Sequence, residues 1–454
     1  MYIHDEKPLF RKNRGHDNIY RVLLLLIGLL FFAVILKGWL SGSINPFFSS
    51  TPTPTRTSNN YALEGEMFFT SGDLDKSIAA YRQAHAIDPG NPAILSELAR
   101  IQAYSTSLLT TDNERRTRMQ EALASIEKAV VLAPEDSTVN AIHAFVLDWY
   151  ASPALAGDNW QDYLGKAEKA AVKALQLDNQ NALALAYYAE ILVDQQKWLP
   201  AEQYINQALE RDPSLMDVHR IAAYTQESLS NYTQAIEQYQ AAAEITPNLT
   251  FLYLAIGANY RQLAFKASTD PEQKFLYEKA LEYFAKVTTI NEQLGIKDPI
   301  PYMSIARTYT QMGDALVASL NAEKALSFDP TSPDVYGQLG IIYFKARNYE
   351  GSIPAFKCAI RGCTAEESCT VRKCDPATDP AISIVGMPLT ANTAVYYYTY
   401  GSVLAALHRK TQPYCKDAMQ VFAEVRAAFP TDTTAMSIIE EGENICISYG
   451  FTRP

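Results

Sequence analysis

The stretch that decides the fold of most of the chain is Pro333–Ile360, which reads PDVYGQLGIIYFKARNYEGSIPAFKCAI. Its first half combines two aromatic residues with a large apolar residue that is followed by glycine. Its second half combines a small residue with an aromatic residue four positions later. The residues are Tyr336, Leu339, Gly340 and Tyr343, then Ser352 and Phe356. Spacings of three and four keep side chains on one face of a helix. The stretch therefore predicts two helices that approach closely at the small residues, with aromatic rings beside them.

Copies of this pattern recur along the chain. The closing phrases of successive copies end at Asn179, Pro213 and Pro247, which are 34 residues apart. A fixed period of this length is typical of repeat architectures. The other copies are carried by Tyr61, Gly65, Phe68, Ser77, Tyr81 and Pro89; by Ala235, Tyr239, Ala242 and Pro247; by Tyr253, Ile256, Gly257, Tyr260, Ala280 and Phe284; and by Tyr302, Ile305, Ala306, Tyr309, Ala318 and Pro330. Glu64 departs from the pattern at an apolar position of the first copy.

The residues of these copies resemble the tetratricopeptide repeat (TPR) family. The resemblance implies an all-α fold, an α-solenoid of about nine helix-turn-helix repeats from Tyr61 to Pro430. Residues 433–447 would form a capping helix that covers the last apolar face. Three repeats are about eleven residues longer than the others. Helix-start signals at Thr111 and Thr269, each followed three residues later by Glu, predict lengthened helices there.

An apolar run near the N-terminus predicts a membrane anchor. Val22 to Leu36 contains no polar side chain, and extension to Leu40 adds Lys37 as the one charge. A helix over 22–40 would be about 28 Å long, close to the hydrocarbon thickness of a bilayer. Residues 1–21 are rich in basic side chains, so the positive-inside rule makes them a cytoplasmic tail.

The rest of the chain would then lie outside the cytoplasm in a single-pass membrane protein. Residues 41–60 are rich in Ser, Thr and Pro, which predicts a stalk that separates the membrane from the body at 61–454. The alternative is a cleaved signal peptide, because Ser41-Gly42-Ser43 offers small residues after the apolar run. That alternative predicts a secreted, soluble repeat protein.

Composition narrows the class of function. Of the 454 residues 48% are hydrophobic and 20% charged, which fits a folded body, and the net charge of −11 argues against a nucleic-acid partner. No phosphate-binding glycine loop, dinucleotide motif or nucleophile elbow occurs, and the six histidines are not paired at metal spacing. We therefore expect neither an enzyme nor a bound cofactor or metal.

The family resemblance implies a concave surface, lined by the first helix of each repeat, that holds segments of partner proteins. Aromatic and arginine side chains dominate binding hot spots. The candidates expected to face this groove are Arg100, Tyr104, Trp149, Tyr224, Arg261, Arg307 and Tyr398. The alternative for each is packing inside the repeats. The Lys and Asn set with which some family members grip a C-terminal carboxylate does not occur.

All six cysteines fall between Cys358 and Cys446. An even number in an exported body favours disulfides, with zinc or a reactive thiol as alternatives. Cys415 and Cys446 could pin the capping helix to the last repeat. Cys358, Cys363, Cys369 and Cys374 would then pair among themselves, in one of three connectivities, around a loop insert at 362–392.

Two functions fit these features. The first is a membrane-tethered extracytoplasmic scaffold that binds partner segments in its concave groove. The second is a dedicated assembly factor that presents one partner to an envelope enzyme complex, similar to the anchored repeat proteins of cytochrome maturation. Both predict proteins or peptides as partners and membrane contact through residues 22–40.

Overall fold

The computed structural model describes residues 18–41, 56–375 and 377–453. The regular elements in these ranges are all helices, joined by turns and two isolated β-bridges, which confirms the all-α prediction. The chain forms two compact units, Met1–Arg56 and Thr57–Pro454.

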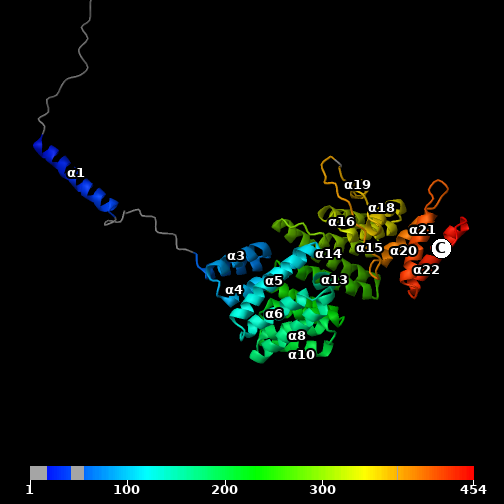
Figure 1. The fold of residues 1–454 in the computed structure, drawn as a ribbon, viewed down its shortest axis with the longest axis horizontal. Helices are drawn as coiled ribbons and strands as arrows, with labels where there is room; N and C mark the ends of the chain where they lie inside the picture. Colours follow the sequence, from blue (N-terminus) through cyan, green and yellow to red (C-terminus); the bar gives the residue numbers. More distant parts are fainter. Residues whose placement is uncertain (1–17, 42–55, 376, 454) are drawn as a thin grey trace, which may run out of the picture. The chain divides into compact units, whose positions relative to one another are not determined.

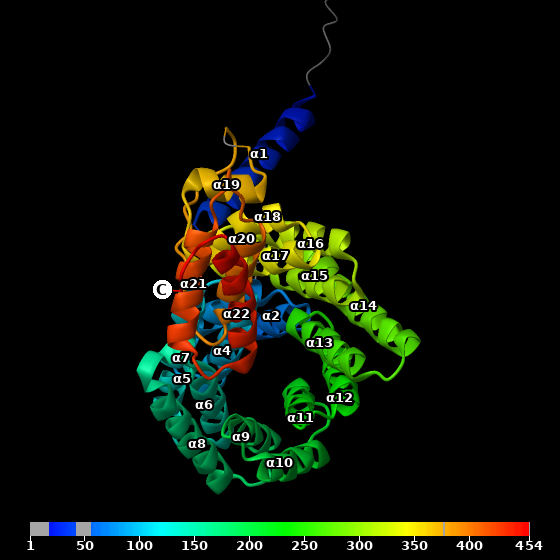
Figure 2. The same ribbon diagram turned by 90° about the vertical axis from the view of Figure 1, so that its right-hand side faces the viewer.

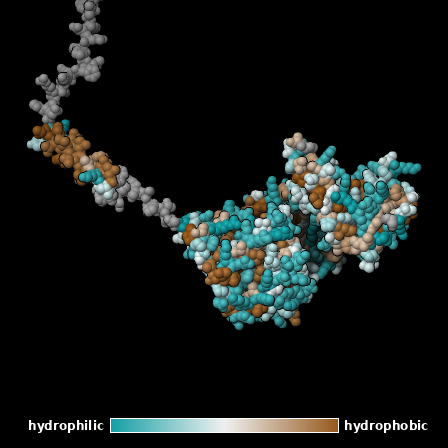
Figure 3. Space-filling model, viewed as in Figure 1, coloured by the Kyte–Doolittle hydropathy of each residue, from teal (hydrophilic) through white to brown (hydrophobic). Residues whose placement is uncertain are grey.

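The first unit contains helix α1 (Ile19–Leu40), which begins three residues before the predicted anchor. Its segment Ile19–Gly38 is long and apolar enough to cross a membrane or to serve as a signal sequence. The apolar side chains that the structure describes on this helix are exposed along its length (Figure 3). Most of the predicted tail, and residues 42–55 of the predicted stalk, lie outside the described residues.

The second unit is a chain of nine helix pairs and a final helix within the described residues (Figure 1), as the repeat pattern predicts. The pairs are α2 (Ser58–Thr70) with α3 (Leu74–Ile87), α4 (Pro92–Ser105) with α5 (Asp112–Leu132), α6 (Ser137–Tyr150) with α8 (Trp160–Leu177), α9 (Ala182–Asp194) with α10 (Trp198–Arg211), α11 (Met216–Ser228) with α12 (Tyr232–Ile245), α13 (Thr250–Lys266) with α14 (Asp270–Leu294), α15 (Ile300–Met312) with α16 (Ala315–Phe328), α17 (Pro333–Lys345) with α18 (Tyr349–Ile360), and α20 (Ala394–Ala406) with α21 (Cys415–Ala428). The final helix is α22 (Thr433–Ser448), at the position of the predicted cap.

Short α-helices occur in two of the connections. Helix α7 (Pro153–Ala156) precedes α8, and α19 (Ala365–Arg372) follows α18. The body begins at Ser58, inside the stretch assigned to the stalk, because Thr57 caps α2 by accepting a hydrogen bond from the backbone N–H of Asn60.

The three long repeats have lengthened second helices, as predicted. Helices α5, α8 and α14 contain 21, 18 and 25 residues. Thr111 and Glu114 form a complete capping box at the start of α5. Thr269 accepts a hydrogen bond from the backbone N–H of Glu272 at the start of α14. In α5 and α14 the extra turns therefore begin at the predicted helix-start signals.

Small residues set the distance within each pair. A Cβ added to Gly340 would lie 2.7 Å from the Phe356 ring, and one added to Gly257 would lie 2.4 Å from the Phe284 ring. Such contacts are too short for an atom, so these positions accept only glycine at this helix separation. The conformation of Pro333–Ile360 therefore matches the interpretation of its sequence.

The row of N-terminal repeats curves, so that repeats far apart in the sequence come into contact (Figure 2). Tyr104 of α4 stacks on Phe251 of α13 with ring centroids 5.5 Å apart. The turn at Gly72, which has a φ of +76°, lies against the backbone of Asn248. We call helices α2–α13 the closed coil. Its core extends from Phe69 to Tyr253 and on to residues of α14.

The remaining helices, α14–α22, form what we call the open array. A second hydrophobic core runs through α15–α22. The insert after α18 folds back on its own repeat, since Cys363 and Ile384 pair through their backbones and Met387 donates its N–H to the carbonyl of Ala359. Tyr397 of α20 then donates its hydroxyl to the carbonyl oxygen of Met387 at 2.7 Å.

Candidate binding face

Successive first helices of the second unit contact one another from α4 to α11 and again from α13 to α22. The residues expected to line a groove all lie on these helices, but they have two different environments. Those on α4, α6 and α11 meet side chains from other repeats. Those on α13, α15 and α20 border hollows on the surface.

Asp217 of α11 is the centre of a buried polar network in the closed coil. Its carboxylate accepts a hydrogen bond from Arg100 at 2.9 Å and one from the Tyr187 hydroxyl at 2.6 Å. The Tyr104 hydroxyl donates to the same carboxylate. Burial alone would raise the pKa of Asp217, but Arg100, Arg220 and the two tyrosines hold it below the ordinary value. Asp217 is therefore a carboxylate at neutral pH.

A second ion pair extends this network. Arg220 of α11 binds Glu190 of α9 through two hydrogen bonds, 2.6 and 2.7 Å long. The indole N–H of Trp149 donates to Glu190 at 3.1 Å, and Nε of Arg220 donates to the Tyr104 hydroxyl at 3.1 Å. Bidentate arginine pairs of this kind are among the strongest polar contacts in proteins.

The network corrects the expectation that Arg100 and Tyr104 face an open groove. Arg100 is 8% exposed and Tyr104 is fully buried. Trp149 is half-buried against Glu190, and half-buried Tyr224 donates to Asp194 at 2.6 Å. The physical reason is the curvature of the closed coil, which brings α11 and α13 onto α4 and fills the space that a partner would need.

One carboxyl group in the closed coil has no partner for its charge. Both oxygens of Asp148 are buried and accept no hydrogen bond within the described residues. Burial raises the pKa of Asp148, and the negative charges of Asp194 and Glu190 raise it further. For Asp194, burial is the largest cause that raises the pKa to about 6. The negative charges of these carboxyl groups therefore repel one another at neutral pH.

The other expected residues border two hollows toward the C-terminal end. The first, which we call the basic hollow, is a cavity of about 290 Å³ that includes Arg261 and Arg307. Its walls come from α13, α15, α17 and α20. Its further lining side chains include Gln311, Gln338, Ile341, Lys345, Val395 and Tyr396.

The second, which we call the apolar hollow, is a cavity of about 400 Å³ that includes Tyr398. It lies among α17, α20 and α22 and the start of α18. Its other main lining side chains are Phe344, Tyr349, Val403, Ile438, Glu441 and Ile445. The structure thus brings Arg261, Arg307 and Tyr398 to surface hollows and separates them from the other four candidates.

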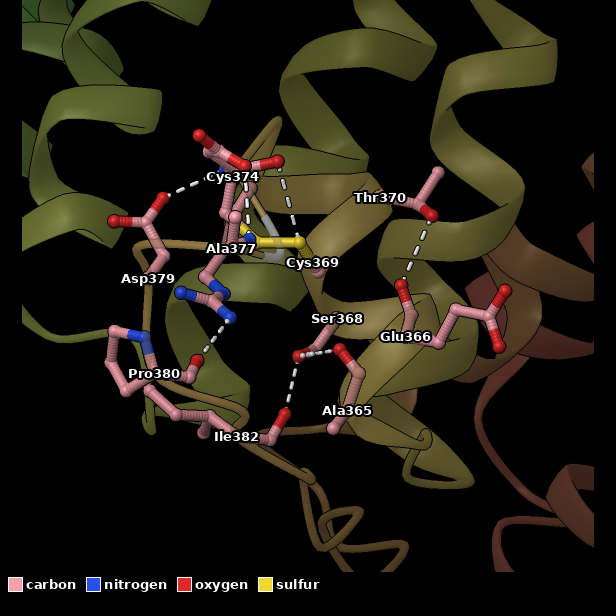
Figure 4. The surroundings of a disulfide bond; sticks show 12 residues. Ala365, Glu366, Ser368, Cys369, Thr370, Cys374, Ala377, Asp379, Pro380 and Ile382 are labelled. Atoms are coloured by element: carbon pink, nitrogen blue, oxygen red, sulfur yellow. Dashed lines mark hydrogen bonds between the residues drawn. A yellow bond between two sulfur atoms is a disulfide. The ribbon is translucent and has the colours of Figure 1, made fainter.

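The six cysteines form three disulfides. Cys415 of α21 is bonded to Cys446 of α22, which links the cap to the last repeat. Cys358 is bonded to Cys363, and Cys369 to Cys374, so each of these pairs closes a short loop beside α18 or α19. Figure 4 shows the Cys369–Cys374 bond and the nearby hydrogen bond from Ser368 to the carbonyl of Ile382. Across the described ranges, no group of three or more His, Cys, Asp or Glu side chains is arranged to hold a metal ion.

Sequence reasoning missed Tyr187, Glu190, Asp217, Arg220 and Lys345. A signal for Glu190 was present, since it interrupts the apolar run ALALAYYAEILV of α9. A charged residue on the inner side of an apolar helix needs a partner. Nothing in the local pattern says that the partner of Glu190 is Arg220, 30 residues later.

Comparison with known proteins agrees with the helix pairs. Residues 189–250 match the model of the tetratricopeptide repeat family. The human IFIT1 dimer with m7Gppp-AAAA aligns with a TM-score of 0.54 and 16% identity, over 86% of this chain and 80% of that chain. The human IFIT1 dimer with PPP-AAAA aligns with a TM-score of 0.53 and 15% identity, over 87% and 83%. At this identity the likeness concerns the fold alone. The family model thus matches one stretch of the helix pairs, and the two solved structures share the helix-pair fold of the chain.

Proposed function

We propose that this protein is a membrane-tethered extracytoplasmic scaffold that holds segments of partner proteins on its first helices from α13 to α20. The observation that carries the proposal is the pair of hollows there, where Arg261, Arg307 and Tyr398 are available to a partner. Hollows that combine aromatic and arginine side chains suit protein recognition.

The placement of the body outside the cytoplasm is supported by three features. Helix α1 is long and apolar enough to span a bilayer. Basic residues precede it, which favours a cytoplasmic N-terminus. The described cysteines are all paired, and disulfides persist in oxidising compartments.

A nucleic-acid partner is a second candidate because the IFIT1 structures of similar fold contain m7Gppp-AAAA or PPP-AAAA. The net charge of −11 weighs against it, since phosphate backbones bind basic surfaces. Glu441 in the apolar hollow would also repel a polyanion that followed the face. A protein segment is therefore the partner that we propose.

Topology is tested with protease added to intact cells that express the full chain. We expect loss of the body after Asn60 and protection of a tag placed before Met1. Protection of the body together with loss of the tag would show that the orientation is the reverse of the proposed one. A mature chain that starts near Ile44 would support the secreted alternative.

Partner binding is tested with a photoreactive amino acid at Gln311, whose side chain borders the basic hollow. The matched control is Lys274, 70% exposed on α14. We expect protein adducts from Gln311 that are absent from Lys274. One dominant adduct would favour the dedicated assembly factor, and several would favour a general scaffold. Equal adducts from both positions would contradict a binding face.

A further inference from the structure

Three basic side chains from three successive first helices meet in the basic hollow. Arg261 comes from α13, Arg307 from α15 and Lys345 from α17, and all three border the same cavity. Helices of different repeats therefore contribute one charge each. The set is a product of the helix packing and has no counterpart in any short sequence motif.

These charges lack carboxylate partners. None of the three forms an ion pair within the described residues, whereas Arg100 and Arg220 of the closed coil each form one. Arg307 donates from Nε to the Gln338 side chain at 2.6 Å, and Gln338 in turn donates to Asp334. Asp334 also accepts a hydrogen bond of 2.7 Å from the Tyr396 hydroxyl. Three cationic side chains thus line the hollow, and no carboxylate is among its lining residues.

Arg261 is the most constrained of the three. Its guanidinium is half-buried, lies over the Phe284 ring and donates no hydrogen bond among the described residues. Burial lowers the pKa of Arg261, and the positive charge of Arg307 lowers it further. A half-buried guanidinium without an acceptor is unfavourable, and an anion in the hollow would remove that cost.

The apolar hollow lies further along the same helices. On α20, Val395 borders the basic hollow, while Tyr398 and Ser402 border the apolar one. On α17, Lys345 borders the basic hollow and the adjacent Phe344 borders the apolar one. From Val395, α20 rises by roughly 10 Å to Ser402 and by roughly 16 Å to the far lining residue Ala406, at 1.5 Å per residue. An extended chain covers 10–16 Å with about three to five residues.

We propose that the two hollows together recognise a protein segment with an acidic side chain and, about three to five residues away, a bulky apolar side chain. The carboxylate would accept hydrogen bonds from Arg261, Arg307 and Lys345. The apolar side chain would lie among Phe344, Tyr398 and Ile438. This inference rests on the proposed function and specifies the chemistry of the partner.

The test uses the full chain in detergent micelles and a synthetic peptide array. Each peptide is acetylated and amidated, so that no terminal carboxylate is present, and carries one Glu and one Phe in a Gly/Ser background at spacings of one to eight. We expect binding to peak at spacings of three to five. Replacement of Glu by Gln, or of Phe by Ser, should weaken it at least tenfold. Equal binding of the Gln peptides would overturn the proposal.

The matched protein variants are Arg261→Gln with Arg307→Gln, against Lys274→Gln with Lys279→Gln on the exposed face of α14. Both pairs change the net charge equally. We expect at least a tenfold loss of peptide binding in the first pair, little change in the second, and an unchanged melting temperature in both. Peptide binding by the first variant at wild-type strength would assign the arginines to packing.

A separate arm offers the oligonucleotide PPP-AAAA in place of the peptides. Tight binding that is lost in the Arg261→Gln, Arg307→Gln variant would overturn the protein assignment in favour of a nucleic acid. The proposed function can survive failure of this inference: cross-linked partners from Gln311 that persist in the double variant would keep the binding face and reject the acidic motif.

Discussion

In the closed coil, Arg100 lies against the carboxylate of Asp217, 117 residues later in the chain, whereas in the open array Arg307 and Lys345 face a hollow without an ion partner among the described residues. Both regions consist of the same helix pairs. Their first helices differ in whether a carboxylate from another repeat arrives opposite each cation. The comparison indicates that polar residues of the closed coil pair with one another across repeats, while Arg307 and Lys345 of the open array form no ion pair among the described residues.

The largest expected effect is on the Asp217 network. Asp217→Ala should lower the free energy of unfolding by about 3–5 kcal/mol, because it leaves buried Arg100, Tyr104 and Tyr187 without their acceptor. Chemical denaturation measures this. Asp334→Ala in the open array should cost less than about 1 kcal/mol, since Asp334 is exposed. Equal losses would erase the distinction between the regions.

The pH dependence of the same network has a definite sign. Because the pKa of Asp217 is held below its ordinary value, its stabilisation is present at neutral pH and disappears as the pH falls below about 4. The wild-type coil should therefore lose stability in acid, and the Asp217→Ala variant should lose less over the same range. Thermal melts from pH 7 to pH 3 compare them.

The open array depends more on its disulfides, because its end has a neighbour on one side only. Replacing Cys415 and Cys446 by Ser should cost about 3–4 kcal/mol in the chain-entropy model, for a sequence separation of 31. The same change at Cys369 and Cys374, separated by 5, should cost about 2 kcal/mol. Hydrogen exchange should show faster opening of α20–α22 and unchanged protection of the closed coil. Six free thiols in the purified protein would contradict the disulfides themselves.

Substitutions at two glycines with positive φ distinguish the contact that closes the coil from the local backbone strain of the substituted residue. Gly72→Ala should cost about 2–3 kcal/mol, because the new methyl group would lie 2.3 Å from the carbonyl oxygen of Asn248. Gly313 has a similar φ but open space around it, so Gly313→Ala should cost about 1 kcal/mol. Differential scanning calorimetry measures both. Similar losses would indicate that the Gly72 contact does not hold the coil closed.

The smallest expected effect is an increase in stability, whereas the variants above all lower it. Burial and neighbouring carboxylates raise the pKa of Asp148, so its contribution to stability is fully present below about pH 4 and declines as the pH rises through the folded-state pKa. Asp148→Asn should raise stability at pH 7 by about 1 kcal/mol and reduce this decline. A lower melting temperature for the variant at pH 7 would show that the carboxylate has a partner.

The repeat pattern was sufficient for most of the fold. Gly340 with Phe356, and Gly257 with Phe284, lie together as their spacing predicts, and Thr111 and Thr269 begin the long helices. These contacts join residues close in sequence. Local spacing, capping chemistry and side-chain size are enough to specify them.

The candidate site was predicted only in part. Arg261, Arg307 and Tyr398 border hollows, but Arg100 and Tyr104 do not. Each of these residues occupies a first helix, so the pattern assigns them all to the same face. The difference depends on what lies opposite that face, and the repeat pattern contains no information about that.

The sequence by itself determined the helix pairs, their number and the capping helix, because a helix pair is stabilised by contacts within about 34 residues. The tertiary structure decided that α4 meets α11 and α13, and therefore that Arg100 is buried while Arg307 is accessible. The physical reason is that the small rotations between successive repeats add up along the chain. Each repeat adds a small rotation to the next, and the sum over several repeats determines whether the face closes on itself or stays open.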